Sequence, residues 1–311
     1  MKSIITEEMR FRKKTVECAI KHNNNALAAR KYHTSTPQVW RWRNRYDGTW
    51  ESLRPKSRRP KSHPNQHTDE ELALIKKKYQ RYGHEGLAET YVQCVRAGYQ
   101  RTYDSMCRQI RKRKWKRTEE KKKAYPKSRW QPEPVTYPGE KVQIDIKYVP
   151  VQCMGWDSHG VRYYQITAID EYSRKRVCSI VDEKSVNHTA AFLKRLEQRF
   201  GFPIHCVQTD NGSEFTNDPS QTDRLSLFEK QLEALDIKYK KTRPYSPWQN
   251  GKVERSHRED TERFYMREFK SLEALIKAHT RYVNRGNNIH RKVLGFKSPN
   301  EVVAAYFSKA I

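Results

Sequence analysis

Residues 141–149 read Lys-Val-Gln-Ile-Asp-Ile-Lys-Tyr-Val, and this short stretch decides the fold. Apolar Val142, Ile144 and Ile146 alternate with polar residues, and a period of two is typical of a β-strand with one buried face. Asp145 belongs to the polar half of the alternation. The pattern therefore predicts a strand that leaves one carboxylate on its accessible face.

A second carboxylate follows a second apolar run. Residues 204–210 read Ile-His-Cys-Val-Gln-Thr-Asp and are followed by Asn211-Gly212, a turn pair that ends strands. Asp210 is therefore expected at the carboxyl tip of a strand, the place where α/β proteins commonly carry their sites.

A third carboxylate lies in residues 243–257, which read Arg-Pro-Tyr-Ser-Pro-Trp-Gln-Asn-Gly-Lys-Val-Glu-Arg-Ser-His. Ser246 can cap a helix and Pro247 can open it. Glu254 then falls about two turns into that helix. Two strands and one helix could thus bring Asp145, Asp210 and Glu254 together.

Three clustered carboxylates repel each other and raise one another's pKa unless a cation is bound. Hard divalent ions such as Mg²⁺ or Mn²⁺ prefer oxygen ligands and accept carboxylates together with phosphate oxygens. Two such ions on either side of a phosphate stabilise the attacking and leaving oxygens of an in-line displacement. We therefore expect two ions per site, held by Asp145, Asp210 and Glu254, and phosphodiester chemistry.

The three blocks together resemble the retroviral-integrase-like catalytic core of DDE transposases of bacterial insertion sequences. The resemblance spans roughly residues 140–300 and depends on the order of the blocks, since each one alone is a weak signal. Asp210 and Glu254 are 44 positions apart, longer than the interval usual for the family. The extra length is expected in the polar, turn-rich residues 217–223.

The resemblance implies a ribonuclease H-like α/β domain with a mixed five-stranded sheet and flanking helices. Strands are expected at residues 142–149, 162–169, 175–182, 204–209 and 237–241, and helices at 187–200, 225–235 and 248–269. Asp170 and Glu171 are expected to anchor a turn with Ser173 and Arg174. Glu214 is expected behind the ligands or facing DNA.

The chain carries a formal net charge of +27 over 311 residues. Residues 1–140 contain 34 Lys and Arg against 15 Asp and Glu, which gives +19 for this part alone. Such a surface releases counterions from a phosphate backbone when it docks, so double-stranded DNA is the expected partner. Binding to a membrane surface or an acidic protein is an alternative that leaves the three acids unexplained.

Other classes are set aside by composition. Neither a membrane span nor a secretory signal is visible, so a cytoplasmic protein is expected, nucleoid-associated if bacterial. The six cysteines form no Cys-x-x-Cys pair, which favours reduced thiols over a disulfide framework. Cys18, His22 and His33 lack a fourth ligand at a suitable spacing, so zinc is not expected.

Residues 7–22, 25–32 and 36–46 are expected to form three helices. The third has Val39, Trp42 and Tyr46 on one face, and this arrangement is typical of a helix-turn-helix. An ordinary three-helix bundle with a basic surface is the alternative. The side chains suited to base edges in a major groove are Gln38, Arg41 and Arg45.

A basic, proline-rich run at residues 53–64 predicts an extended linker, either tracking DNA through residues such as Arg58 and Arg59 or acting as a plain spacer. A second helix-turn-helix is expected from Thr68, with Arg108 and Arg111 facing outward. The expected domains are residues 1–50, 51–67 (linker), 68–113, 114–139 (linker), 140–270 (catalytic core) and 271–311 (C-terminal helical segment).

A helix start is itself an anion site, and Asn250, Lys252 and Arg255 crowd the one before Glu254. We expect them to hold DNA phosphates.

Joining two element ends to one target requires at least a homodimer in the DNA complex.

The resemblance implies a transposase that binds terminal inverted repeats, hydrolyses a phosphodiester and transfers the strand to target DNA. Asp145 would bridge both ions, Asp210 would hold one, and Glu254 would complete the second site. Two alternatives stay open. A DNA-binding regulator would need only residues 1–113, and a ribonuclease H-type nuclease would not need tandem helix-turn-helix units.

Overall fold

The structure, a computed structural model, describes residues 5–56, 60, 63, 65–115, 133–217, 222–243 and 246–308. The chain divides into two compact units, Met1–His67 and Thr68–Ile311. Among the described residues, no helix is both long enough and apolar enough to cross a membrane. All six cysteines are free, and five of them are buried.

The first unit consists of three helices, α1 (Glu7–Lys21), α2 (Asn25–Lys31) and α3 (Thr36–Arg45), and a short 3-10 turn, η1 (Glu51–Leu53). Thr6 and Asn24 cap the first two helices by accepting from backbone N–H groups. The buried side of α1 is formed by Met9, Val16, Cys18 and Ala19, whereas Phe11 and Ile20 are 39% and 48% exposed.

The second unit begins with three more helices, α4 (Asp69–Tyr82), α5 (Leu87–Val95) and α6 (Tyr103–Lys112). We call residues 68–115 the second helical unit. Thr68 forms a capping box with Glu71, and Thr102 caps α6. The common core of α4, α5 and α6 contains Ile75, Cys94, Met106 and Ile110, among others.

Residues 140–270 fold around a mixed sheet. The strands are β1 (Val142–Tyr148), β2 (Tyr164–Asp170), β3 (Arg176–Val181), β4 (Cys206–Thr209) and β5 (Lys238–Lys241), in the order β3-β2-β1-β4-β5. A 3-10 turn, η2 (Val151–Cys153), lies between β1 and β2. The first three strands pair antiparallel, whereas β4 and β5 run parallel to β1. The predicted five-stranded mixed sheet is confirmed.

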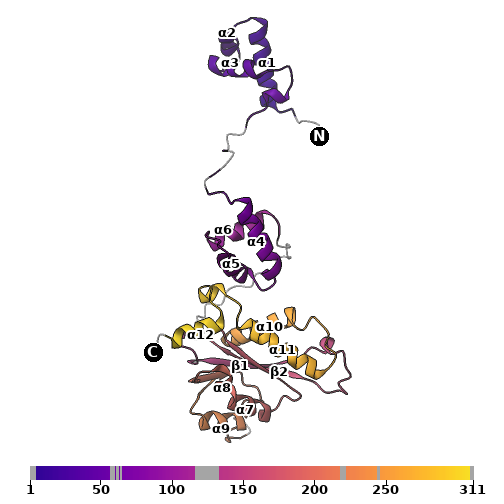
Figure 1. The fold of residues 1–311 in the computed structure, drawn as a ribbon, viewed down its shortest axis with the longest axis vertical. Helices are drawn as coiled ribbons and strands as arrows, with labels where there is room; N and C mark the ends of the chain where they lie inside the picture. The colour runs from indigo at the N-terminus through magenta and orange to yellow at the C-terminus, as the bar shows by residue number, and fades with distance from the viewer. Residues whose placement is uncertain are drawn as a thin grey trace. The chain divides into compact units, whose positions relative to one another are not determined.

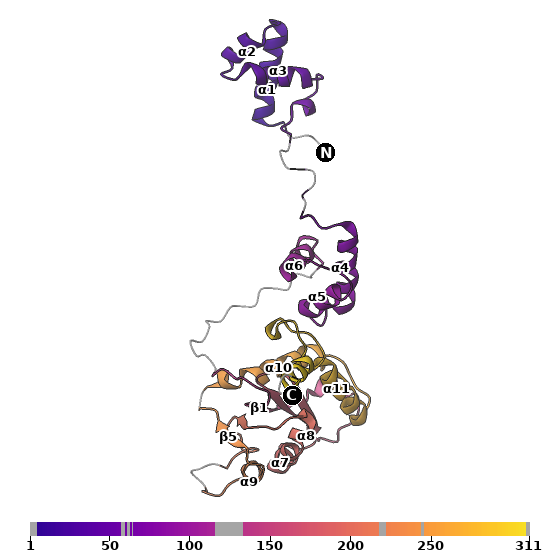
Figure 2. The same cartoon turned by 60° about the vertical axis from the view of Figure 1, so that its left-hand side comes forward.

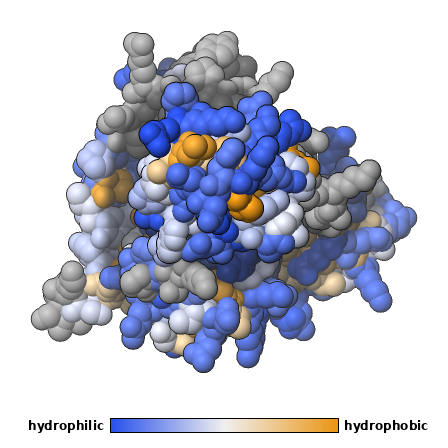
Figure 3. Space-filling view, turned by 90° about the horizontal axis from the view of Figure 1, so that it is seen from above, coloured by the Kyte–Doolittle hydropathy of each residue, from blue (hydrophilic) through white to orange (hydrophobic). Residues whose placement is uncertain are grey.

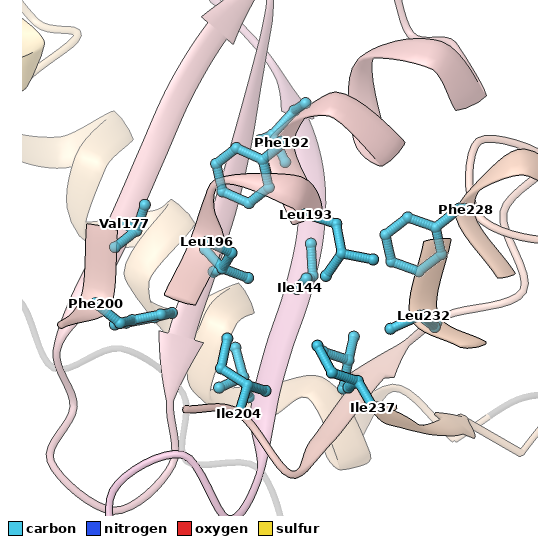
Figure 4. Close-up of a cluster of buried hydrophobic side chains, with 14 of the residues drawn as sticks. Ile144, Val177, Phe192, Leu193, Leu196, Phe200, Ile204, Phe228, Leu232 and Ile237 are labelled. Carbon is cyan, nitrogen blue, oxygen red and sulfur yellow. The ribbon is translucent and has the colours of Figure 1, made fainter. Parts of the chain in front are cut away.

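Helices cover both faces of this sheet (Figures 1 and 2). On one face lie α7 (Val186–Lys194), α8 (Leu196–Phe200) and α9 (Leu227–Ala234); on the other lie α10 (Gly251–Arg263) and α11 (Leu272–Gly286). Ile144, Phe192, Leu193, Phe200 and Phe228 are among the buried residues that join the first face to its helices (Figure 4).

Two predicted helices differ from the observed ones. The helix expected at residues 187–200 is interrupted at Arg195, which separates α7 from α8. The helix expected at 248–269 starts as a 3-10 turn, η3 (Pro247–Asn250), and α10 ends at Arg263. Phe264 and Phe269 then turn inward into a separate aromatic core under α11. The chain continues through η4 (Lys292–Leu294) to α12 (Pro299–Phe307).

Candidate active site

The face of the sheet that carries α10 also carries the first two predicted acids. Gln143 of β1 and Gln208 of β4 are register partners across the parallel pair. Asp145 and Asp210 follow these glutamines by two residues each, so all four side chains lie on the same side of the sheet. Asp210 comes directly after the last residue of β4, as the sequence predicts.

Asp145 is half-buried and keeps one specific neighbour. Its Oδ1 accepts from the backbone N–H of Ile146 at 2.8 Å, and its Oδ2 lies 3.4 Å from Nδ1 of His257 on α10. The His257 side chain is 11% exposed, and its Nε2 has no hydrogen-bond partner among the described residues. One ring nitrogen is thus directed at the acid while the other remains unused.

Asp210 is positioned by the turn that follows it. Its Oδ1 accepts from the N–H of Gly212 at 3.2 Å. A Cβ on Gly212 would lie 2.6 Å from the carboxylate of Glu214, so a larger residue here would require the Glu214 side chain to move. Glu214 is buried, and Lys184 contacts its Oε1 at 2.9 Å. The turn therefore brings a fourth carboxylate, with its own lysine, beside Asp210.

Glu254 lies in the first turn of α10, and two glutamines hold that turn in place. The side-chain amide groups of Gln143 and Gln208 both donate to the backbone carbonyl of Gln249, at 2.9 Å each. Gln208 also donates to Oδ1 of Asn250 at 2.9 Å, and Gln143 accepts from the N–H of Val253 at 3.2 Å. The strands that bear the aspartates thus also fix the helix that bears the glutamate.

Electrostatics place the three acids in one neighbourhood. Burial raises the pKa of Asp210, and the negative charge of Asp145 raises it further. Burial also raises the pKa of Glu254, with Asp145 and Asp210 adding to the effect. Each ionised acid is therefore made less stable by the others, which is the setting that favours a bound cation.

The donor chemistry of the site fits a hard divalent cation, since all three side chains offer carboxylate oxygens. In the described residues, however, no group of three or more His, Cys, Asp or Glu side chains is arranged closely enough to hold a metal ion. Asp145, Asp210 and Glu254 lie within electrostatic reach of one another without closing into a ligand cage.

Two predicted phosphate-binding residues are engaged inside the protein. Asn250 is 4% exposed and bonds with Gln208, as described above. Lys252 forms an ion pair with Glu171, which also accepts from Gln143 at 2.9 Å and lies 3.0 Å from Lys141. Both side chains anchor the start of α10 in this structure. Their assignment to DNA remains a prediction.

Asp170 anchors a turn, as the sequence predicts. Its carboxylate accepts from the N–H and the hydroxyl of Ser173, and from the N–H of Gly139 at 2.9 Å. Gly139 has φ +85°, and a Cβ there would lie 2.0 Å from the carbonyl oxygen of Pro203. Among the described residues, the side chain of Glu171 pairs with Lys141 and Lys252 and not with the turn.

The predicted base-reading residues of α3 divide into two groups. Gln38 and Arg41 are exposed, whereas Arg45 is half-buried with Nε and Nη2 unpartnered among the described residues. Trp40, which is not among the predicted DNA contacts, is 55% exposed on the same helix. Figure 3 shows a mostly hydrophilic face with small hydrophobic spots. Arg43 is turned inward to Asn23 and Asn25.

The other predicted DNA contacts are exposed or lie outside the described residues. Arg58 and Arg59 belong to the latter group. Arg108 and Arg111 are exposed on α6. Arg255 is exposed on α10, and its nearest acid is Glu259 at 3.5 Å.

Lys184 and His257 lie beside the candidate site but are not among the predicted site residues. Lys184 follows β3 by three residues, so no local signal connects it to the turn after β4. The position of His257 near the acids could have been predicted from the sequence. It lies three residues after Glu254, and residues three apart share a helix face.

Comparisons with known proteins agree with this architecture. The integrase core domain family matches residues 135–247, a range that contains Asp145 and Asp210 and ends before Glu254. A helix-turn-helix domain family matches residues 11–61. The second helical unit lies outside both ranges.

Among curated proteins, the putative integrase ORF3 of Spiroplasma virus SpV1-C74 is 30% identical over 135 residues, covering 41% of this chain and 36% of the viral protein. The chain thus matches about a third of the length of that relative.

Two solved structures are also similar. The catalytic core domain of BIV integrase has 20% identity and a TM-score of 0.41, covering 55% of this chain and 98% of that one. The simian T-cell lymphotropic virus intasome in complex with PP2A regulatory subunit B56 gamma has 15% identity and a TM-score of 0.42, covering 74% of each chain. The chain is thus similar to the integrase core domain family over residues 135–247 and to a helix-turn-helix domain family over residues 11–61.

Proposed function

We propose that this protein is a DNA transposase that binds the terminal inverted repeats of its own element, hydrolyses a phosphodiester at each end and transfers the freed strand to target DNA. The observation that supports this most directly is the convergence of Asp145, Asp210 and Glu254 from β1, β4 and α10 on one face of an integrase-type sheet. Their mutual effect on pKa supports a shared site.

In this proposal Asp145, Asp210 and Glu254 hold two divalent ions, magnesium or manganese. When bound, the ions supply the positive charge that stabilises the attacking and leaving oxygens. Gln143 and Gln208 keep the glutamate-bearing helix at a fixed position relative to both aspartates. His257 contacts the carboxylate of Asp145 and limits its rotation. None of these roles needs a covalent bond between protein and DNA.

DNA binding in this proposal begins with the first unit. Gln38 and Arg41 of α3 are exposed and suited to adenine and guanine edges. The excess of +19 in residues 1–140 supplies affinity for the backbone. Two element ends must meet one target, so the working form is at least a dimer.

A strand-transfer assay tests the proposal. The full-length protein is incubated with a labelled duplex that carries the ends of its own element and with a plasmid target, with and without Mg²⁺. Metal-dependent joining that disappears in Glu254→Gln supports a transposase. Specific end binding without cleavage or joining points to a DNA-binding regulator, and cleavage of RNA/DNA hybrids independent of the ends points to a nuclease.

A further inference from the structure

The second helical unit is docked on the C-terminal part of the core. We call residues 287–298, between α11 and α12, the C-terminal loop. Three kinds of contact join the loop and its flanking helices to α5 and α6: a buried acid–histidine pair, an aromatic contact and peripheral ion pairs.

The buried pair joins Glu89 of α5 to His290 of the loop. Glu89 is 5% exposed and His290 is 6% exposed. Oε2 of Glu89 accepts from the backbone N–H of His290 at 2.8 Å and lies 2.6 Å from its Nδ1. The other ring nitrogen lies 3.2 Å from Glu301 of α12 and 3.1 Å from Arg96. A carboxylate is buried this deeply only when it is paired and hydrogen-bonded.

The aromatic contact centres on Phe296. Its ring lies 5.1 Å from that of Tyr91 on α5 and 5.2 Å from that of Tyr103 on α6, measured between centroids. Lys292 of the same loop lies over the Tyr103 ring at 4.8 Å. Aromatic and cation–π contacts of this geometry are favourable beyond the area they bury.

The loop adopts an uncommon backbone to present this ring. Phe296 has φ +65°, and Gly295 before it has φ +63°. A bulky residue in the left-handed region is strained and persists only where its surroundings hold it there. Backbone bonds between Arg291 and Lys297 and between Phe296 and Arg291 close the loop below the ring.

A further ion pair lies at the edge of the contact. Arg285 of α11 pairs with Glu85, which precedes α5 and whose side chain is 5% exposed. Arg108, Arg111 and Lys112 of α6 remain exposed. Docking thus uses the Tyr103 side of α6 and leaves its basic residues free for a polyanion.

We infer that the second helical unit is a fixed part of the body that carries the candidate active site, and that duplex DNA bound by the basic residues of α6 reaches the site at a set position because of this docking. The inference rests on the proposed function for its DNA and adds what determines the position of that DNA. Glu89, His290 and Phe296 are positioning residues in this scheme, since they act through α5 and α6.

The test uses three full-length variants. Phe296→Ala removes the ring from the docking contact. Val293→Ala is the matched control, since Val293 is in the same loop and 70% exposed. The third variant carries ten inserted Gly and Ser residues between positions 120 and 121, which lengthens the connection from the second helical unit to the core without altering the docking residues.

Hydrogen–deuterium exchange gives a readout that needs neither DNA nor metal. Phe296→Ala should speed exchange at least tenfold in both residues 87–95 and 287–298 while leaving β1 unchanged, and Val293→Ala should match the wild type. Equal exchange in wild type and Phe296→Ala would overturn the docking, whatever the joining assay gives. Wild-type protein that shows this docking but joins no ends would instead count against the proposed function.

Joining then tests the positional role. The insertion should change joining less than twofold, whereas Phe296→Ala should lower it at least tenfold with DNA affinity within threefold of wild type. A large loss in the insertion variant with none in Phe296→Ala would show that the connection, and not the docking, sets the position of the DNA, and would overturn the inference.

Discussion

The carboxylates of the core fall into two regions. We call Asp145, Asp210 and Glu254 the open region, and the buried Asp260 with its partners the closed region. Asp145, Asp210 and Glu254 are partly exposed, and the pKa of the latter two is raised. Asp260, only six residues beyond Glu254 on the same helix, is fully buried. Its pKa is nevertheless lowered, because Arg176 pairs with it at 3.0 Å and Gln165 donates to it at 2.8 Å.

The difference between these regions separates structural acids from candidate functional ones. Every oxygen of Asp260 has a donor, so the buried charge is compensated and holds α10 against β2 and β3. Asp210 and Glu254 also have positive neighbours, Lys184 for the first and His257 and Arg258 for the second, but burial and the other acids outweigh them and the pKa stays raised. Acids in this setting are candidates for a functional site.

The largest effect is expected for Asp210→Asn. Joining should fall by about 10³-fold or more, because the site loses one of its charged oxygen donors. The same change should raise the melting temperature in metal-free buffer, since the ionised carboxylate is disfavoured in the folded state. Strand transfer and thermal unfolding measure the two. Asp157→Asn, on an exposed loop, is the control. A fall in the melting temperature of Asp210→Asn would mean that the ionised carboxylate of Asp210 stabilises the folded state.

The closed region should respond in the opposite way. Arg176→Met leaves Asp260 buried without its partner and should cost about 3–5 kcal/mol in the free energy of unfolding. Urea denaturation measures it, and the exposed Arg255→Met should cost less than about 0.5 kcal/mol. Adding Asp260→Leu to Arg176→Met should recover part of the loss. A loss as small as that of the exposed control would contradict the distinction.

A histidine of the closed region should make stability depend on pH. Burial lowers the pKa of His279 to about 4, so the folded state holds the ring neutral, whereas the unfolded chain binds a proton near pH 6.5. Its contribution is complete above pH 6.5 and is lost as the pH falls toward 4. Between pH 7.5 and 5.5 the loss should be about 1.4 kcal/mol.

The measurement compares the wild type with His279→Phe, whose ring can keep the contacts with Phe264 and Tyr265. The unfolding free energy of the wild type, relative to that of His279→Phe, should fall as the pH falls from 7.5 to 5.5. A constant difference over this range would mean that His279 titrates as it does in the unfolded chain.

The smallest effect is expected between the two regions, at Gln208. Gln208→Leu removes donors to Gln249 and Asn250 and should cost about 1 kcal/mol, because Gln143 still donates to the same carbonyl of Gln249. Joining should fall further than this stability loss explains, since the start of α10 positions Glu254. Denaturation and joining assays on the same variant compare its loss of stability with its loss of activity. Full joining activity in a destabilised variant would mean that the glutamines serve stability alone.

Local signals predicted most of the fold. The alternation in β1 and the Asn-Gly turn after Asp210 each specify backbone structure within a few residues. The five strands and the helix-turn-helix pattern could therefore be read directly. The break at Arg195 and the inward turn at Phe264 could not, because the cores that Leu196 and Phe264 enter are assembled from residues far apart in the sequence.

The sequence by itself determined which elements carry the three acids: a strand for Asp145, the end of a strand for Asp210 and a helix for Glu254. Only the tertiary structure decided which charges are neutralised and by what. Lys184 with Glu214, Lys252 with Glu171, and His290 with Glu89 are separated by 30, 81 and 201 positions. Such pairs depend on how the sheet and helices are assembled, and the pattern around each residue carries no information about its distant partner.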